Sequence, residues 1–282
     1  MDRRHTRDLL HDSGLAPHKR LGQNFLVDAN IPRRIAAAVA LGPDERVLEV
    51  GVGLGALTRP LAEAAGEVIG IEADSGLIRL HEEWRDLPDN VRLIHADILK
   101  TDLASFRPPG GRLKIAANLP YAISTPFLFR LIEQRDALET AVLMLQKELA
   151  ERLCAAPRTK EYGAPTVLLA ACADVETLFD VGPAAFHPRP RVDSRVIRLR
   201  FFPEPARLAE LGPFDRPLFT RVVRAAFSQR RKTLANALSG LVPDKAALLG
   251  QLERAGIAAE RRAETLTLAE YARLARCLAE AA

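Results

Sequence analysis

Short runs rich in Val, Ile and Leu alternate with helical patterns from Arg46 to about Arg200, and this alternation limits the fold more than any other feature of the chain. The runs expected to form strands are residues 46–50, 67–72, 91–97, 113–118 and 141–146. Between them, residues 55–65, 75–84 and 124–134 carry apolar residues at helical spacing. Strands separated by helices need crossover connections, so the pattern predicts an α/β fold with a mostly parallel sheet covered on both faces.

The pattern changes beyond this region. Two more strand-like runs, 173–181 and 195–202, flank the loop GPAAFHPRPRVDS and are expected to pair antiparallel at the sheet edge. After FFPEP the helical pattern continues alone, over 219–238, 245–256 and 267–281. We therefore predict two domains, a large α/β domain over residues 1–203 and a small all-α domain over residues 204–282.

Positive charge is concentrated in two parts of the chain. Residues 182–240 hold twelve Arg and Lys against four Asp and Glu, and residues 1–35 hold seven against four. The whole chain has a net charge of +4, so the remaining residues sum to −7. Such asymmetry is typical of a surface that faces a polyanion, although Arg-rich helices with solvated faces would give the same count.

Composition excludes several classes of protein. No apolar run approaches the ~20 residues that a membrane-spanning helix needs, and the N-terminus MDRRHTRDLLHDSG lacks the apolar core of a secretory signal. The three cysteines lie far apart and form no CxxC pair. We expect a cytoplasmic protein with no membrane segment, no disulfide and no metal site.

A glycine-rich stretch, VLEVGVGLGALT, falls between the first predicted strand and its helix. Gly51, Gly53 and Gly55 allow a tight turn and a close approach of a ligand to the backbone. Glu72 ends the next strand, 21 residues after Gly51, which is the offset at which an acidic side chain meets ribose hydroxyls in dinucleotide sites. These features leave NAD and S-adenosylmethionine as rival cofactors.

Three details favour S-adenosylmethionine. The glycine spacing is GxGxG and not the GxGxxG of the dinucleotide fingerprint, and Glu49 stands two residues before it. Asp97 ends the third strand, where its carboxylate can accept a hydrogen bond from an adenine amine; the alternative is that Asp97 only caps the helical segment that follows. Ligands of open parallel sheets bind beyond the carboxyl ends of the strands, where all these residues are expected.

The sequence NLPY ends the fourth strand at the same edge. The amide oxygen of Asn118 and the backbone carbonyl of Leu119 can accept both hydrogens of an adenine N6 amine, which would direct its lone pair at a sulfonium methyl group. Pro120 limits the freedom of the turn, and Tyr121 can stack on the base. Catalysis would then consist mainly of positioning and electrostatics.

Taken together, these motifs resemble those of the rRNA adenine N6-dimethyltransferases, and most of all the bacterial small-subunit enzymes of the KsgA/RsmA family. The resemblance runs through HKRLGQNFLVD, VLEVGVGLGALT, IEAD, HADILK, NLPYAIST, LMLQKELAERL, EYG, FHPRPRVDS and AAFSQRRKTLANAL, and weakens after about residue 240. It implies a Rossmann-like S-adenosylmethionine-dependent methyltransferase core with a mostly parallel sheet, followed by a small all-α C-terminal domain.

The resemblance also implies roles for particular residues. The expected contacts of S-adenosylmethionine are Asn24, Leu26, Gly51, Glu72, Asp97 and Asn118. Phe186 would sandwich the target adenine opposite Tyr121, whereas without the resemblance it would be read as a core residue between strands. Arg230, Arg231 and Lys232 would contact RNA phosphates. Val52 and Ala122 depart from the usual residues of the family, but neither belongs to the proposed chemistry.

The implied activity is the dimethylation of N6 on two adjacent adenosines in the 3′-terminal hairpin of small-subunit (16S) rRNA during ribosome biogenesis. The expected partner is this rRNA within a 30S pre-ribosomal particle, and we expect a monomer. Two alternatives stay open: a large-subunit rRNA adenine N6-methyltransferase of the macrolide-resistance type, and a ribosome-assembly or RNA-binding factor that retains the fold. An NAD-dependent oxidoreductase is a third alternative, which the glycine spacing makes weaker than the other two.

Overall fold

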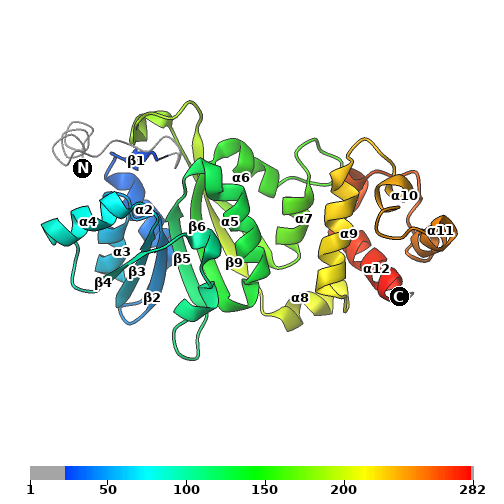
Figure 1. Cartoon of the computed structure of the whole chain (residues 1–282), viewed down its shortest axis with the longest axis horizontal. Helices are drawn as coiled ribbons and strands as arrows, with labels where there is room; N and C mark the ends of the chain where they lie inside the picture. Colours follow the sequence, from blue (N-terminus) through cyan, green and yellow to red (C-terminus); the bar gives the residue numbers. More distant parts are fainter. Residues whose placement is uncertain (1–22, 281–282) are drawn as a thin grey trace. The chain divides into compact units, whose positions relative to one another are not determined.

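The computed structural model describes residues 23–280, and its contacts divide the chain into two compact units (Figure 1). The first unit runs to Ala150 and resumes over Val175–Phe201; the second contains Glu151–Asp174 and the chain from Phe202 onward. The second unit thus includes residues 151–174, which the sequence pattern had assigned to the first domain. Residues 1–22, with the start of the HKRLGQNFLVD motif and most of the N-terminal basic residues, lie outside the described part.

A seven-stranded sheet forms the centre of the first unit, in the order β4-β3-β2-β5-β6-β9-β7. Its strands are β2 (Arg46–Val50), β3 (Glu67–Glu72), β4 (Val91–His95), β5 (Leu113–Asn118), β6 (Leu138–Gln146), β7 (Ala173–Val181) and β9 (Ser194–Phe201). The first five pair in parallel, and β9 runs antiparallel to β6. The prediction of a mostly parallel sheet is confirmed, and β7 and β9 are neighbours at its edge.

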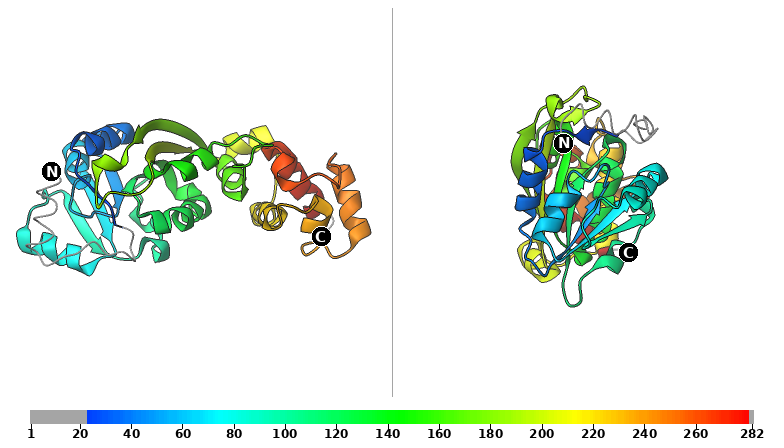
Figure 2. Two further views of the ribbon diagram at one scale, coloured as in Figure 1. Left: turned by 90° about the horizontal axis from the view of Figure 1, so that it is seen from above. Right: turned by 90° about the vertical axis from the view of Figure 1, so that its left-hand side faces the viewer.

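The central strands are buried on both faces, so they need helices on both sides, and helices lie on both sides of the strands in Figure 2. The main helices of the first unit are α2 (Asn30–Val39), α3 (Thr58–Ala64), α4 (Ser75–Trp84) and α5 (Tyr121–Glu133), and α6 (Lys147–Leu153) follows β6. Ile35 and Leu61 are fully buried in the core cluster that joins α2 and α3 to the sheet. The core therefore fixes the strand ends from which the site is built.

Two strands that the sequence did not predict form a second, two-stranded sheet. β1 (Phe25–Leu26) pairs antiparallel with β8 (Phe186–His187), with Leu26 opposite Phe186. The amide of Val27 extends this pairing by donating to the Ala185 carbonyl at 2.9 Å. The N-terminal GQNFL segment is thereby attached along the FHPRP loop.

Helices build most of the second unit: α7 (Ala164–Ala170), α8 (Glu204–Leu211), α9 (Arg216–Ser228), α10 (Leu234–Ala237), α11 (Lys245–Arg254) and α12 (Leu268–Ala279). Phe227 stands between Tyr162 and Tyr271 in its core, with 6.0 Å between ring centroids in each pair. The helix expected over 219–238 is interrupted after Ser228, because residues 229–233 offer no apolar side chain to bury. The chain turns there, and α10 begins at Leu234, which is fully buried.

Candidate active site

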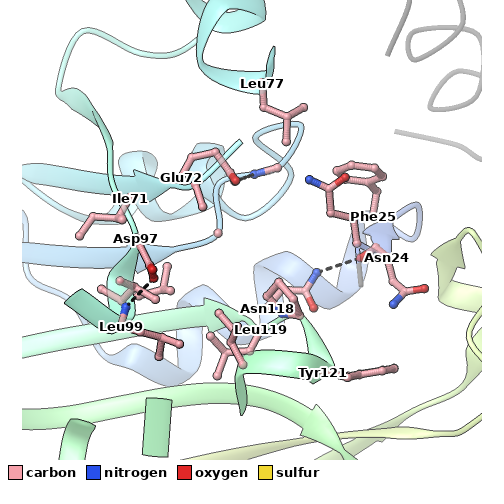
Figure 3. Close-up of a pocket in the computed structure, with 18 of the residues that line it drawn as sticks. Asn24, Phe25, Ile71, Glu72, Leu77, Asp97, Leu99, Asn118, Leu119 and Tyr121 are labelled. Carbon is pink, nitrogen blue, oxygen red and sulfur yellow. Dashed lines mark hydrogen bonds between the residues drawn. The ribbon is translucent and has the colours of Figure 1, made fainter. Parts of the chain in front are cut away.

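The carboxyl ends of four neighbouring strands meet around one pocket of about 410 Å³ in the first unit. Gly51 follows β2, Glu72 ends β3, Asp97 follows β4 and Asn118 ends β5, and all four line this pocket. Figure 3 shows Glu72, Asp97 and Asn118 around it. Leu119, Tyr121, Asn24 and Phe186 line it as well. The pocket therefore joins residues that the sequence had suggested for one site from six separate segments, four of which are strand ends that meet at one edge of the parallel sheet.

The glycine loop lies against the strand end that carries NLPY. Gly51 has a φ of 80° and donates its amide hydrogen to the Ile71 carbonyl at 2.9 Å. A methyl group at Gly51 would stand 3.7 Å from the Asn118 carbonyl oxygen and would reach toward Pro120. Glycine at this position thus combines a left-handed conformation with close approach of the two segments.

Glu72 is held in place by backbone amides. One carboxylate oxygen accepts from Gly53 at 3.0 Å and the other from Asp74 at 2.9 Å, and the residue is 7% exposed. A carboxylate oxygen has a second lone pair, so both oxygens can still accept hydrogen bonds from a ligand in the pocket. The side chain is positioned before any ligand arrives.

Asp97 caps a helical turn and also lines the pocket. Its Oδ1 accepts from the Leu99 amide at 2.9 Å and so caps the short helical turn Ile98–Lys100, while the residue also lines the pocket. Its other oxygen lies 3.7 Å from the exposed Lys100 ammonium. The cap fixes the carboxylate at the pocket wall, where it can accept a hydrogen bond.

Asn118 is oriented by the N-terminal segment. Its Nδ2 donates to the Asn24 carbonyl at 3.3 Å, so Oδ1 is the end of the amide turned away from Asn24 (Figure 3). The antiparallel pairing of β1 with β8 holds the strand that follows Asn24. The small sheet thus determines which end of the Asn118 amide is free to act as an acceptor.

The Tyr121 ring is fixed by its hydroxyl, which lies 2.9 Å from Oγ of the fully buried Ser194 at the start of β9. Burial raises the pKa of Tyr121, the Ser194 hydrogen bond partly offsets this shift, and the charge of Asp193 adds to it. The hydroxyl therefore keeps its proton at neutral pH and is no general base. Phe186 lines the same pocket and is 1% exposed.

Four of the predicted site residues lie elsewhere. Leu26 does not line this pocket; its side chain packs into the hydrophobic core, while its neighbours Asn24 and Phe25 line the pocket. Arg230, Arg231 and Lys232 lie in the second unit, in the turn between α9 and α10. There, Nη2 of Arg230 donates to the carbonyls of Lys160 and Tyr162, so this residue connects the QRRKTL and EYG motifs.

Sequence reasoning missed the apolar walls of the pocket. The apolar wall is formed by Phe25, Ile71, Leu77 and Leu99. Three of these residues stand within two positions of a predicted polar site residue, and Leu77 lies on α4, the helix after β3. Apolar residues beside site residues are common to every strand end, so the sequence offered no signal to distinguish them.

Glu49, the acidic residue of ExGxGxG, lies beneath the glycine loop and is fully buried. Among the described residues, no donor makes a hydrogen bond to either of its carboxyl oxygens. Burial raises the pKa of Glu49 to about 8, and the charge of Glu72 adds to the shift, while the facing Thr58 hydroxyl and Arg59 oppose it. Glu49 is therefore a neutral carboxylic acid at pH 7.

Comparison with solved structures identifies the class. A dimethyladenosine transferase from Plasmodium falciparum superposes with a TM-score of 0.73 at 26% identity, covering 89% of this chain and 95% of that one. The 23S rRNA methyltransferase ErmE superposes with a TM-score of 0.64 at 29% identity, covering 91% of this chain and all of that one. Together with the glycine loop opposite Glu72, these similarities define a Rossmann-like methyltransferase.

Comparison of sequences identifies the family. Residues 14–280 match the family described as ribosomal RNA adenine dimethylase. The ribosomal RNA small subunit methyltransferase A of Desulfotalea psychrophila is 48% identical, over 95% of this chain and 94% of that protein, and the one of Magnetococcus marinus is 45% identical over the same shares. The chain belongs to the ribosomal RNA adenine dimethylase family.

Two classes of feature are absent from the part of the chain that the structure describes. Between residues 23 and 280 no helix has the length and apolar character to cross a membrane. The same residues contain no group of three His, Cys, Asp or Glu side chains placed to hold a metal ion.

Replacing Glu49 by Gln should remove a pH dependence of stability. Because the folded-state pKa of Glu49 is raised from 4.5 to about 8, the unfolded chain releases a proton that the folded protein keeps, and the free energy of unfolding falls as pH rises through this window. The slope is about 1.4 kcal/mol per pH unit. We expect Glu49→Gln to be more stable than the wild type at pH 8 and similar to it near pH 5, measured by urea unfolding.

Glu63→Gln is the matched control for this experiment, because Glu63 is an exposed carboxylate on α3. It should leave the pH dependence of stability as in the wild type. Equal pH slopes for the wild type and Glu49→Gln would contradict the assignment of a neutral, buried acid at position 49.

Proposed function

We propose that the pocket of the first unit binds S-adenosylmethionine and a target adenine side by side. The chain is a small-subunit ribosomal RNA adenine dimethyltransferase, as expected from its full-length similarity to small-subunit methyltransferases at 48% and 45% identity. The observation that carries the proposed assignment of residues is the meeting of Asn118 and Glu72 in one pocket.

The lining of the pocket suits a cationic donor of hydrogen bonds. It includes the carboxylates of Glu72 and Asp97 and no Arg or Lys side chain among the described residues. S-adenosylmethionine carries a sulfonium and an ammonium group, which carboxylates attract, and ribose hydroxyls and an adenine amine, which donate to acceptors. The oxidoreductase alternative is disfavoured by the match of residues 14–280 to the ribosomal RNA adenine dimethylase family.

Particular residues would hold particular parts of the cofactor. Glu72 would accept from ribose hydroxyls and Asp97 from the adenine amine, while Gly51 would allow close approach to the backbone; the backbone hydrogen bonds that orient the two carboxylates support these roles. When bound, S-adenosylmethionine supplies an electrophilic methyl group. Asn24 would contribute mainly by orienting Asn118.

Asn118 and Leu119 would act on the N6 amine of the target. With its Nδ2 committed to Asn24, the Asn118 amide presents Oδ1 as an acceptor for one N6 hydrogen, and the Leu119 carbonyl is the expected acceptor for the other. Both hydrogens are then directed toward the protein, which favours a pyramidal nitrogen with its lone pair exposed. Such pre-positioned acceptors contribute electrostatically without reorganising during the reaction.

Tyr121 and Phe186 would hold the base itself. The Ser194 hydrogen bond holds the hydroxyl end of the Tyr121 ring, and Phe186 lines the same pocket from β8. A base removed from its stack would lie between the two rings, as base-modifying enzymes commonly arrange. The same pocket must accept N6-monomethyladenosine, because a second methyl group follows on each of two adjacent adenosines.

The second unit would contact the RNA backbone. Arg231 and Lys232 are exposed in the turn between α9 and α10 and are suited to phosphates, whereas Arg230 anchors this turn to the EYG segment. We take the substrate to be the 3′-terminal hairpin of 16S rRNA in a 30S pre-ribosomal particle, and the enzyme to be a monomer. A large-subunit target is less favoured, because the large-subunit enzyme ErmE is only 29% identical, whereas the small-subunit relatives are 48% and 45% identical. A role in ribosome assembly can accompany catalysis.

Asn118→Ala should lower the rate of methyl transfer about 100- to 1,000-fold, the usual cost of removing one pre-positioned polar group at a reacting atom. The measurement is transfer of labelled methyl groups to small-subunit particles lacking adenine dimethylation, with large-subunit rRNA assayed in parallel. Asn236→Ala, at an exposed position of α10, is the matched control and should keep wild-type activity. Label in the large-subunit rRNA alone would reassign the target, and a fully active Asn118→Ala would overturn the role of the amide.

Substitutions of Tyr121 should separate its ring from its hydroxyl. Tyr121→Ala removes the stacking surface and should weaken capture of the base by about 1–3 kcal/mol. Tyr121→Phe keeps the ring and loses only the contact with Ser194, so its KM for the small-subunit particle should stay near the wild-type value. A Phe variant as impaired as the Ala variant would show that the hydroxyl, and not stacking, is what the reaction needs.

A further inference from the structure

The peptide groups of Gly53 are held by two side chains from different elements. Its amide donates to Glu72 at 3.0 Å, and its carbonyl oxygen lies 3.0 Å from Nε2 of His81 on α4. Gly53 has a φ of 58° and lines the pocket. Its conformation, and through it the position of the Glu72 carboxylate, therefore depends on what His81 can donate.

His81 stands between two acceptors. Its Nδ1 lies 2.7 Å from the Asp86 carboxylate, and its Nε2 faces the Gly53 carbonyl, which can only accept. A neutral imidazole carries one N–H, so it can serve one of these partners and must turn a lone pair toward the other. Only the imidazolium form donates to both. The side chain is 2% exposed, which leaves no space for water to relieve the conflict.

Arg59 binds the Asp86 carboxylate on the side away from His81 and also binds the glycine loop. One guanidinium nitrogen donates to the second carboxylate oxygen of Asp86, and the other donates to the carbonyls of Leu54 and Gly55 at 3.1 and 2.9 Å. Both oxygens of the Asp86 carboxylate therefore face nitrogen atoms, one from Arg59 and one from His81. The glycine loop is thus tied at three successive residues to one group of charges: Arg59, Asp86 and His81.

We infer that His81 is a positioning residue for cofactor binding, acting as an imidazolium that joins Asp86 to the Gly53 carbonyl and so keeps the glycine loop and Glu72 in their binding geometry. This inference rests on the proposed function, because it takes the pocket to be the cofactor site. When either of these two hydrogen bonds of His81 is lost, the loop populates other conformations, and apparent affinity falls in proportion to the competent fraction.

Histidine changes charge between about pH 5 and 8, so the effect should depend on pH in that range. The charged or titratable groups around His81 are Asp86 after α4, Arg59 on α3 and, across Gly53, Glu72 at the end of β3. Glu49 in β2, close to Glu72 and Arg59, also titrates, with its pKa raised to about 8. A comparison of two proteins at each pH cancels the contribution of Glu49 and of the ligand's own amine.

The test is the Kd of S-adenosylhomocysteine, measured by calorimetry from pH 6 to 8.5 for the wild type and His81→Gln. Gln can donate to one acceptor but carries no charge. The ratio of the variant's Kd to that of the wild type should be about tenfold at pH 6, the equivalent of one hydrogen bond to a charged group, and should fall to about twofold by pH 8.5. A binding readout separates this effect from any change in the methyl-transfer step.

His95→Gln is the matched control. His95 is exposed, and its Nε2 has one acceptor, the Ala73 carbonyl at 3.2 Å, which a neutral imidazole satisfies. Its Kd ratio to the wild type should stay near one at every pH. Asp86→Asn provides a second route if His81→Gln does not fold: it removes the anionic acceptor that Nδ1 of His81 contacts at 2.7 Å, so it should weaken binding and reduce the difference between pH 6 and pH 8.5.

The outcomes are distinct. A Kd ratio for His81→Gln that is constant with pH, or equal to one throughout, would overturn the inference while leaving the proposed function in place. A folded wild-type protein that does not bind S-adenosylhomocysteine at any of these pH values would overturn the cofactor assignment, and the inference with it.

Discussion

Parallel pairing of β2 with β3 on one side and β5 on the other is the constraint on which the site depends. The registers place Val50 beside both Ile71 and Ala117, so the residues that follow emerge together at one edge of the sheet. Glu72 then reaches back to the Gly53 amide, and the Asn118 carbonyl lies close to Gly51. The backbone pairing of the strands brings residues far apart in sequence to one edge, and the buried core and the Glu72 side chain then hold them there.

The sequence was most informative where one local pattern determined the structure. The bounds of β2, β3 and β5 and of α4 agree with the hydrophobic pattern, because each element is long enough to show its period and is buried accordingly. The polar residues at the strand ends could be assigned to one edge for the same reason. The interruption at residues 229–233 also has a local cause in hindsight, since this run lacks an apolar side chain to bury.

Features that depend on distant partners could not be read in this way. The β1–β8 sheet has two residues in each strand, too few for any periodicity, and it was this pairing that placed Leu26 in the core and not in the pocket. The arrangement of Arg59, Asp86 and His81 likewise brings together three ordinary surface residue types from separate segments. Buried acids differ in a further way that spacing does not reveal: Glu72 accepts two amide hydrogens, whereas Glu49 is protonated.

The β1–β8 sheet also has a thermodynamic consequence. One of its strands follows Asn24, which orients the amide beside the proposed methyl-donor site, and the other begins with Phe186 on the side proposed for the base. A ligand that favours the paired state from either side favours it for the other ligand as well, and linkage makes the two effects equal. A ladder of four residues can thereby make the enzyme hold its two reactants more firmly together than it holds either one alone.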